Sequence, residues 1–78
     1  MEWKIIDKKL VNNFEFKSQT ELVRFLLKVA HFADEMNHHP DCKIHKAFQL
    51  EITLFTHDKQ QITALDKQLA NKIDDLLK

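Results

Sequence analysis

The sequence predicts an α+β two-layer sandwich, in which helices pack on one face of an antiparallel sheet. Residues 10–16 and 48–57 alternate between polar and apolar side chains, which is typical of strands that bury one face. Two longer stretches, which follow Ser18 and Thr63, repeat apolar residues at the spacing of an amphipathic helix. Strands that neighbour each other in the chain, followed by helices, favour a sheet covered on one side.

The first part of the chain predicts a hairpin. Residues 3–6 are expected to form a short strand, residues 7–9 a turn, and residues 10–16 a second strand. One face of this second strand carries Leu10, Asn12, Phe14 and Phe16. The chain contains no glycine, so we expect two-residue turns that need positive φ to use Asn or Asp.

The capping-box pattern Ser18-Gln19-Thr20-Glu21 predicts where the first helix begins. Its apolar stripe consists of Leu22, Phe25, Leu26, Val29, Ala33 and Met36. Leu27 and Phe32 widen the stripe, so the helix is expected to bury a second flank. We expect the helix to end near Asn37, because Pro40 disfavours helical geometry at His39.

The second half of the chain predicts one clear strand and a final helix. In the strand, Phe48, Leu50, Ile52 and Leu54 point one way, and Gln49, Glu51, Thr53, Phe55 and His57 point the other. Residues 42–45 are a candidate for a shorter strand, and residues 58–61 are expected to form a loop. Thr63 is expected to cap the last helix, whose apolar stripe is Leu65, Leu69, Ile73 and Leu76.

The composition narrows the class of protein. A chain of 78 residues accommodates one domain, and we expect residues 1–78 to form it. Twelve basic and twelve acidic side chains cancel, which argues against binding of nucleic acid or membrane through charge alone. The single cysteine, Cys42, excludes an intramolecular disulfide and a cysteine-based metal site. We expect a cytoplasmic protein, because no apolar run has the length of a signal peptide or a membrane span.

Titratable side chains cluster at the predicted ends of elements. Asp34, His38 and His39 lie at the end of the first helix, His57 ends the main strand, and Asp66 lies in the first turn of the last helix. Side chains at such ends can converge on one cleft. Histidine titrates near neutrality, so these residues predict a site that both donates and accepts protons.

Other roles for the same residue types stay open at this point. His31, inside the first helix, and His45, in a turn or short strand, are interpreted as incidental. Asp66 could simply complement the dipole of its helix. Three histidines and an acid could also hold zinc. The common pair of histidines one helical turn apart is missing, however.

Two segments and one later residue carry a resemblance to a known family. They are Asp34-Glu35-Met36-Asn37-His38-His39-Pro40-Asp41, then Ile52-Thr53-Leu54-Phe55-Thr56-His57, and finally Asp66. In these positions the chain resembles the pterin-4a-carbinolamine dehydratase family. The family combines an acidic or polar residue, His-His-Pro, a strand ending in Thr-His, and a later Asp. The separations fit, since Asp34 lies four residues before His38 and Asp66 lies nine after His57. The resemblance covers nearly the whole chain, apart from an N-terminal helix found in many members.

The resemblance implies a four-stranded antiparallel sheet with helices on one face, assembled into a homo-oligomer, either a tetramer or a dimer. It implies dehydration of 4a-hydroxytetrahydropterin to quinonoid dihydropterin in tetrahydrobiopterin recycling, with no metal and no cofactor. The implied catalytic residues are His38, His39, His57 and Asp66, and the implied contacts to the pterin are His39, Asp34, Pro40 and Thr56. We expect His38 and His57 to share the proton transfers, and Asp66 to orient a histidine.

One position departs from the family pattern. The family usually has an aromatic residue ten positions before the histidine of Thr-His, where this chain has Ala47. Alternation predicts that Phe48 faces the core and Ala47 the side of His57, so an aromatic contact to the pterin is expected to be missing or displaced. Some members are dimerisation partners of a transcription factor, so a non-catalytic binding module of the same fold is the alternative function. Retention of the histidines and Asp66 favours the enzyme.

Overall fold

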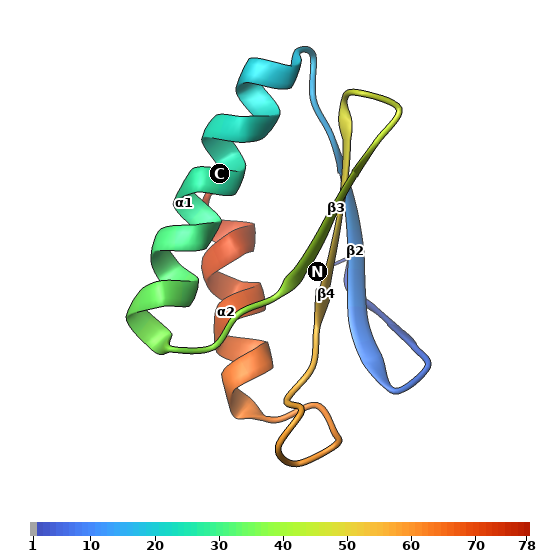
Figure 1. Cartoon of the computed structure of the whole chain (residues 1–78), viewed down its shortest axis with the longest axis vertical. Coiled ribbons are helices and arrows are strands. Elements are labelled where there is room, and N and C mark those ends of the chain that lie inside the picture. The colour runs from blue at the N-terminus through green and yellow to red at the C-terminus, as the bar shows by residue number, and fades with distance from the viewer. Residues whose placement is uncertain (1) are drawn as a thin grey trace.

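The computed structural model describes residues 2–78 and confirms the predicted fold class. Four antiparallel strands form one sheet in the order β1-β2-β4-β3, and both helices lie on the same face of it (Figure 1). The elements are β1 (Lys4–Ile6), β2 (Lys9–Glu15), α1 (Gln19–Met36), β3 (Asp41–His45), β4 (Gln49–Leu54) and α2 (Ala64–Asp75). The segment that was only a candidate for a strand is therefore β3, an edge strand.

Helix α1 begins and ends where the sequence predicts. The Ser18 hydroxyl accepts a hydrogen bond from the Glu21 N–H at 3.1 Å, which satisfies one of the free donors of the first turn. Asn37 takes a left-handed conformation with a φ of 51°, and its N–H bonds back to the carbonyls of the last turn. This reversal turns the following histidines back toward the end of the helix.

Both hairpins reach positive φ without glycine. Asp7 and Lys8 have φ values of 52° and 68° in the two-residue turn between β1 and β2, as a type I′ turn requires. Lys46 and Ala47 have φ values of 52° and 65° in the connection between β3 and β4. The expectation that two-residue turns would use Asn or Asp holds at Asp7 and is wrong at Lys8, whereas Lys46 and Ala47 belong to a three-residue connection.

The main strand is shorter than the alternation predicts. β4 begins at Gln49 and ends at Leu54, so His57 lies beyond the strand. Phe48 lies in the turn before β4 and is 44% exposed, so the prediction that it faces the core is wrong. Ala47 is in the same turn, at the end of the sheet opposite to the loop that contains His57 (Figure 1). Alternation fails there because the turn interrupts the strand geometry on which it depends.

The core lies between the sheet and the two helices. Its largest fully buried side chains are Leu50, Ile52 and Leu54 of β4, Leu22 and Val29 of α1, and Leu69 and Ile73 of α2. Burial of each such side chain stabilises the fold by roughly 1.5–3 kcal/mol. Trp3 ties β1 to this assembly, because its indole N–H donates to Asp74 Oδ1 at 3.0 Å. β4 thus contributes three fully buried side chains to the core that it shares with both helices.

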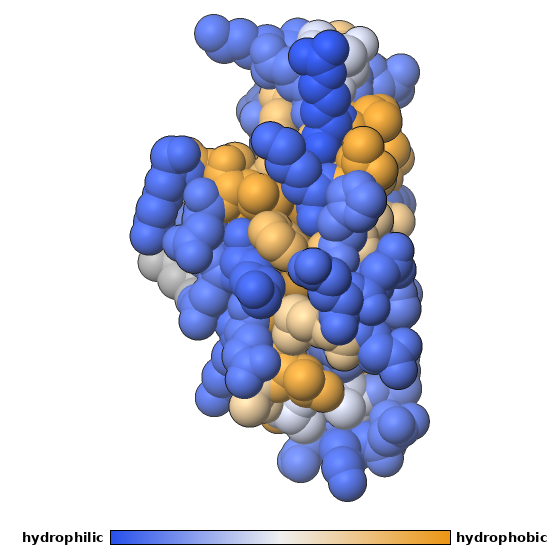
Figure 2. All heavy atoms as spheres, turned by 90° about the vertical axis from the view of Figure 1, so that its left-hand side faces the viewer, coloured by the Kyte–Doolittle hydropathy of each residue, from blue (hydrophilic) through white to orange (hydrophobic). Residues whose placement is uncertain are grey.

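Not every apolar side chain is covered. Figure 2 looks onto the helical side and shows apolar patches between hydrophilic ones. The large apolar side chains that stay exposed include Val23 and Leu27 of α1 and Ile44 of β3. The predicted second flank of α1 is therefore open to solvent at Leu27 in the single chain. None of the helices in residues 2–78 combines the length and apolar character needed to cross a bilayer.

Candidate active site

Asp66 is the centre of the candidate site. Its side chain has no exposed surface, and its two oxygens bind groups from three parts of the chain. Oδ1 lies 2.6 Å from His38 Nε2, while Oδ2 accepts the Thr56 hydroxyl at 2.8 Å and the Thr63 N–H at 2.9 Å. A buried carboxylate is costly unless its oxygens are hydrogen-bonded, and here both of them are.

The local fold of α2 explains why Asp66 is held so closely. Thr63 is the N-cap of α2, and Asp66 is the third helical residue, which reaches back to the N-cap N–H. A carboxylate in the first turn also interacts favourably with the helix dipole. Asp66 therefore complements the dipole of its helix, and the same side chain also contacts His38.

His38 follows the end of α1 and is almost enclosed. Its backbone N–H donates to the Ala33 carbonyl at 3.0 Å, and only 11% of its side chain is exposed. Because Asp66 accepts hydrogen bonds from two other donors, we infer that His38 Nε2 carries a proton and donates it to Oδ1. The second ring nitrogen, Nδ1, is then free to accept a proton.

His39 has an acidic partner of its own at the surface. Its Nε2 lies 2.8 Å from Asp34 Oδ1, and the two side chains are 58% and 71% exposed. The left-handed turn at Asn37 brings His39 back over the last turn of α1, where Asp34 lies. An exposed pair of this kind contributes at most about 1 kcal/mol to stability. Its main consequence is to orient the imidazole.

His57 lies in the turn after β4, with its side chain exposed. The backbone around it is fixed, because Thr56 and Gln61 exchange backbone hydrogen bonds of 3.1 and 3.4 Å. The His57 carbonyl also accepts the Gln60 side-chain amide at 2.7 Å. Its ring packs edge-on against Phe55, with ring centroids 5.3 Å apart.

The residues predicted to form the site fall at one end of the domain, where α1 and β4 end and where β3 and α2 begin (Figure 1). Direct hydrogen bonds join His38 to Asp66 and Asp66 to Thr56. His57 follows Thr56 in the chain, and Pro40 is half-buried in the link from His39 to β3. His31 and His45 form no hydrogen bond or ion pair with this group among the described residues.

Sequence reasoning missed two contributions. The Thr63 hydroxyl lies 2.7 Å from the Thr56 hydroxyl, so the predicted cap of α2 also belongs to the hydrogen-bonded group. Phe55 contacts His57, and Lys9 of β2 lies over the Phe55 ring with its Nζ 5.2 Å from the centroid. Only the pairing register of β2 and β4 brings Lys9 to this position.

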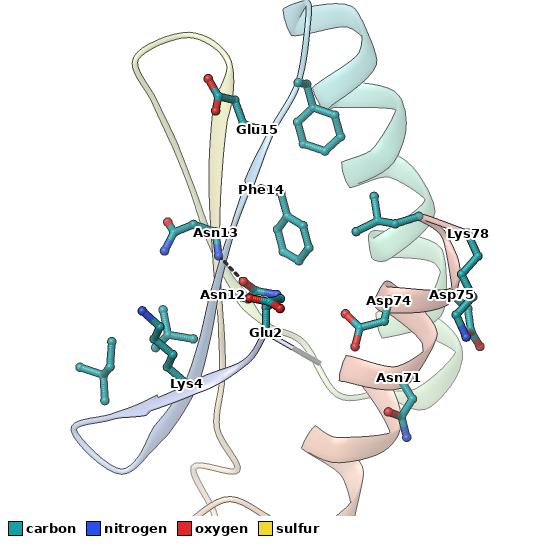
Figure 3. A pocket seen from close by; sticks show the side chains of 14 residues that line it. Glu2, Lys4, Asn12, Asn13, Phe14, Glu15, Asn71, Asp74, Asp75 and Lys78 are labelled. Atoms are coloured by element: carbon teal, nitrogen blue, oxygen red, sulfur yellow. Dashed lines mark hydrogen bonds and ion pairs between the residues drawn. The ribbon is translucent and has the colours of Figure 1, made fainter.

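A groove of about 980 Å³ lies elsewhere, between the edge of β1 and β2 and the C-terminal part of α2 (Figure 3). Asn12, Phe14, Asn71 and Asp74 are among its lining residues, and it contains none of the predicted site residues.

Within residues 2–78, no three His, Cys, Asp or Glu side chains are grouped so that they could hold a metal ion. Desolvation, and to a lesser extent the Asp41 carboxylate, raises the pKa of the Cys42 thiol, which disfavours a nucleophilic thiolate there.

The fold and the site together define a class: a small α+β domain with histidines and carboxylates gathered at one end. Residues 1–76 match the family model described as pterin 4 alpha carbinolamine dehydratase. The chain belongs to this family.

Relatives and solved structures agree with this assignment. A protein of Sulfurisphaera tokodaii named "Putative pterin-4-alpha-carbinolamine dehydratase" is 44% identical over 75 residues, which is 96% of this chain and 80% of the relative. A protein of the same name from Picosynechococcus sp. is 35% identical over 75 residues, with the same coverage.

Among solved structures, a transcriptional coactivator/pterin dehydratase from Brucella melitensis superposes with a TM-score of 0.88 at 27% identity, and 94% of this chain and 79% of that one are covered. A pterin dehydratase-like protein described as a RuBisCO assembly factor in the α-carboxysome superposes with a TM-score of 0.81 at 23% identity, and 97% of this chain and 89% of that one are covered. At this identity the second likeness concerns the fold alone.

Proposed function

We propose that the protein dehydrates 4a-hydroxytetrahydropterin to quinonoid dihydropterin and water by histidine general acid–base catalysis, in tetrahydrobiopterin recycling. The observation that carries the proposal is the hydrogen-bonded chain from His38 through Asp66 to Thr56, with distances of 2.6 and 2.8 Å. These hydrogen bonds link the segment after α1, where His39 follows His38, to the segment after β4, where His57 follows Thr56. Membership of the dehydratase family supports the same reaction.

The reaction suits these groups. Loss of water from the carbinolamine needs a proton delivered to the 4a-hydroxyl and a proton removed from a ring nitrogen, which leaves the C4a–O bond broken and a C=N bond formed. A positioned imidazole accelerates each transfer by roughly 10²–10⁴-fold. No redox change occurs. One group of the enzyme loses a proton and the other gains one, and exchange with water returns both to their starting states before the next turnover. Two histidines in different surroundings can therefore complete the chemistry.

The surroundings suggest how the roles are divided. His57 is exposed, so in the proposal it exchanges a proton directly with the substrate. His38 supplies the second transfer through Nδ1, because Asp66 holds its Nε2. His39, with Asp34 and Pro40, binds the pterin at the surface. Thr56, which the family resemblance offers as a pterin contact, is buried with its hydroxyl bound to Asp66, so we assign it the support of that carboxylate.

The direct test is a stopped-flow dehydration assay with purified protein and freshly generated 4a-hydroxytetrahydropterin. Dehydration also proceeds without enzyme, so each rate is corrected for the rate in buffer. We expect a protein-dependent rate that survives extensive treatment with a chelator. Activity that is lost on chelation and restored by zinc would favour the metal site instead. A rate equal to that in buffer would contradict the dehydratase.

A binding module of the same fold is the second candidate. Val23 and Leu27 are exposed on α1, and exposed apolar side chains gathered on one face are typical of interaction surfaces. The Brucella structure is described as both a coactivator and a dehydratase. Absence of dehydration together with stable binding of a protein partner through α1 would support this candidate.

We also expect the protein to form a homo-oligomer, with a tetramer favoured over a dimer. A 78-residue chain buries only about 60% of the surface that its unfolded state exposes, and Leu27 and Ile44 remain uncovered. Light scattering or sedimentation at micromolar concentration checks this prediction. Leu27→Glu should shift the mass toward the monomer, whereas Lys28→Glu, the adjacent exposed position, should not. A monomeric wild-type protein would contradict the prediction.

A further inference from the structure

His57 differs from the other two histidines of the site in how its ring is held. The rings of His38 and His39 each meet a carboxylate oxygen within 2.8 Å. Among the hydrogen bonds of residues 2–78, none involves the His57 ring. Its ring instead meets Phe55 at a centroid separation of 5.3 Å and an angle of 80° between the ring planes. This is the edge-to-face geometry that aromatic pairs prefer.

Phe55 is itself held in place from the neighbouring strand. The register of β2 and β4 pairs Leu10 with Leu54, so the next residues, Lys9 and Phe55, stand opposite each other. Leu10 and Leu54 face the core, which places Lys9 and Phe55 on the other face of the sheet. Lys9 Nζ lies 5.2 Å from the centre of the Phe55 ring, within the range of a cation–π interaction.

Hydrogen bonds fix the backbone of Thr56 and His57, so the orientation of the His57 ring depends on its side-chain rotamer. Thr56 is fixed by its backbone pairing with Gln61 and by its hydroxyl bond to Asp66. The His57 carbonyl accepts hydrogen bonds from the backbone and side-chain N–H groups of Gln60, at 3.2 and 2.7 Å. An exposed imidazole on such a backbone would still exchange between staggered rotamers. The packing of Phe55 favours one orientation among them.

We propose that Phe55 is a positioning residue for His57, and that Lys9 holds Phe55 in the position this requires. The proposal rests on the proposed function, because it takes His57 to exchange a proton with the substrate. Loss of the aromatic ring would lower the fraction of His57 in the reactive orientation. Such a change lowers kcat more than KM, because binding of the pterin is assigned to His39 and its neighbours.

The test combines NMR spectroscopy with kinetics for Phe55→Leu, Phe55→Tyr and Lys9→Met. Phe48→Leu is the matched control, since Phe48 is a partly exposed phenylalanine in the turn at the opposite end of the sheet. We expect Phe55→Leu to move the carbon-bound ring protons of His57 toward the shifts of free histidine, while those of His38 stay in place. Its kcat should fall roughly three- to thirtyfold with KM nearly unchanged. Phe55→Tyr should retain both properties, and Lys9→Met should show a smaller change in the same direction.

Two results would overturn the proposal. Unchanged His57 shifts and kcat in Phe55→Leu would show that the ring does not orient His57. A raised KM with unchanged kcat would make Phe55 a substrate contact instead. If the wild-type protein shows no dehydration, the proposed function fails, but the His57 shifts in the same variants still decide whether Phe55 positions the ring. If Phe55→Leu does not fold, Lys9→Met decides by the same two readouts, and unchanged His57 shifts and kcat in that variant would overturn the proposal.

Discussion

Replacing His57 by Ala is expected to lower kcat for carbinolamine dehydration by roughly ten- to a thousandfold, the effect of losing one proton-transfer group. The physical reason is that the exposed imidazole is open to a substrate and, in the proposal, exchanges a proton with it. KM should change little, because the interaction removed operates in the transition state rather than in binding. Stopped-flow kinetics corrected for the spontaneous reaction measures both constants.

The other histidines provide the comparison. His38→Ala should lower kcat on a similar scale, whereas His39→Ala should act more on KM, since uniform binding of the substrate affects KM alone. His31→Ala and His45→Ala are the matched controls, because both residues lie outside the hydrogen-bonded group, and they should change neither constant. Wild-type turnover in both His38→Ala and His57→Ala would contradict the acid–base assignment and favour the binding module.

Replacing Asp66 by Ala is expected to lower the free energy of unfolding by roughly 2–5 kcal/mol. The substitution removes the acceptor for the Thr56 hydroxyl, for the Thr63 N–H and for His38, all at a position with no exposed surface. Small domains have a total stability of only about 5–15 kcal/mol, so this change takes away a large part of it. Urea denaturation followed by circular dichroism gives the difference.

Asp66→Asn separates stability from catalysis. The amide keeps the volume of the carboxylate and an oxygen that can accept the Thr56 and Thr63 donors, so more stability should remain than in Asp66→Ala. Its NH₂ group would donate to His38 Nε2 and so reverse the tautomer of that histidine. Since Nδ1 of His38 would then carry the proton and could not accept one, we expect a loss of kcat on the scale of His38→Ala. Asp58→Ala, an exposed acid in the loop after β4, should change stability by less than about 0.5 kcal/mol. An equal effect of Asp58→Ala would contradict the role of the buried site.

The order of elements could be predicted from the sequence because its signals are local. Ser18 and Glu21 mark a helix start by a contact within one turn, and the alternation through Leu50, Ile52 and Leu54 records which face of a strand is buried. The error at Phe48 has the same origin. A local pattern continues through a turn in the sequence, whereas the strand geometry stops there.

The sequence could predict which residues belong to the site, but not how they contact one another. The positions of the histidines and of Asp66 at ends of elements follow from the element order, and the family resemblance selects among them. Complete burial of Asp66 depends on how the start of α2 meets the end of β4, which is a tertiary contact with no local signal. The same holds for Lys9 and Phe55, which are 46 residues apart in the chain and meet through strand register.

The turns without glycine have a consequence for the unfolded chain. A residue with a side chain costs roughly 1–2 kcal/mol in the left-handed region, and Lys8, Lys46 and Ala47 are all held there. Glycine at these positions would relieve that cost, but it would also raise the conformational entropy of the unfolded state, which costs a smaller amount, about 0.4–1 kcal/mol. The strain is the larger effect, so glycine at each position should stabilise the fold by up to about 1 kcal/mol. The chain therefore gives up some folded-state stability at its turns by having no glycine, while its denatured ensemble is narrower than that of a chain with glycine in every turn.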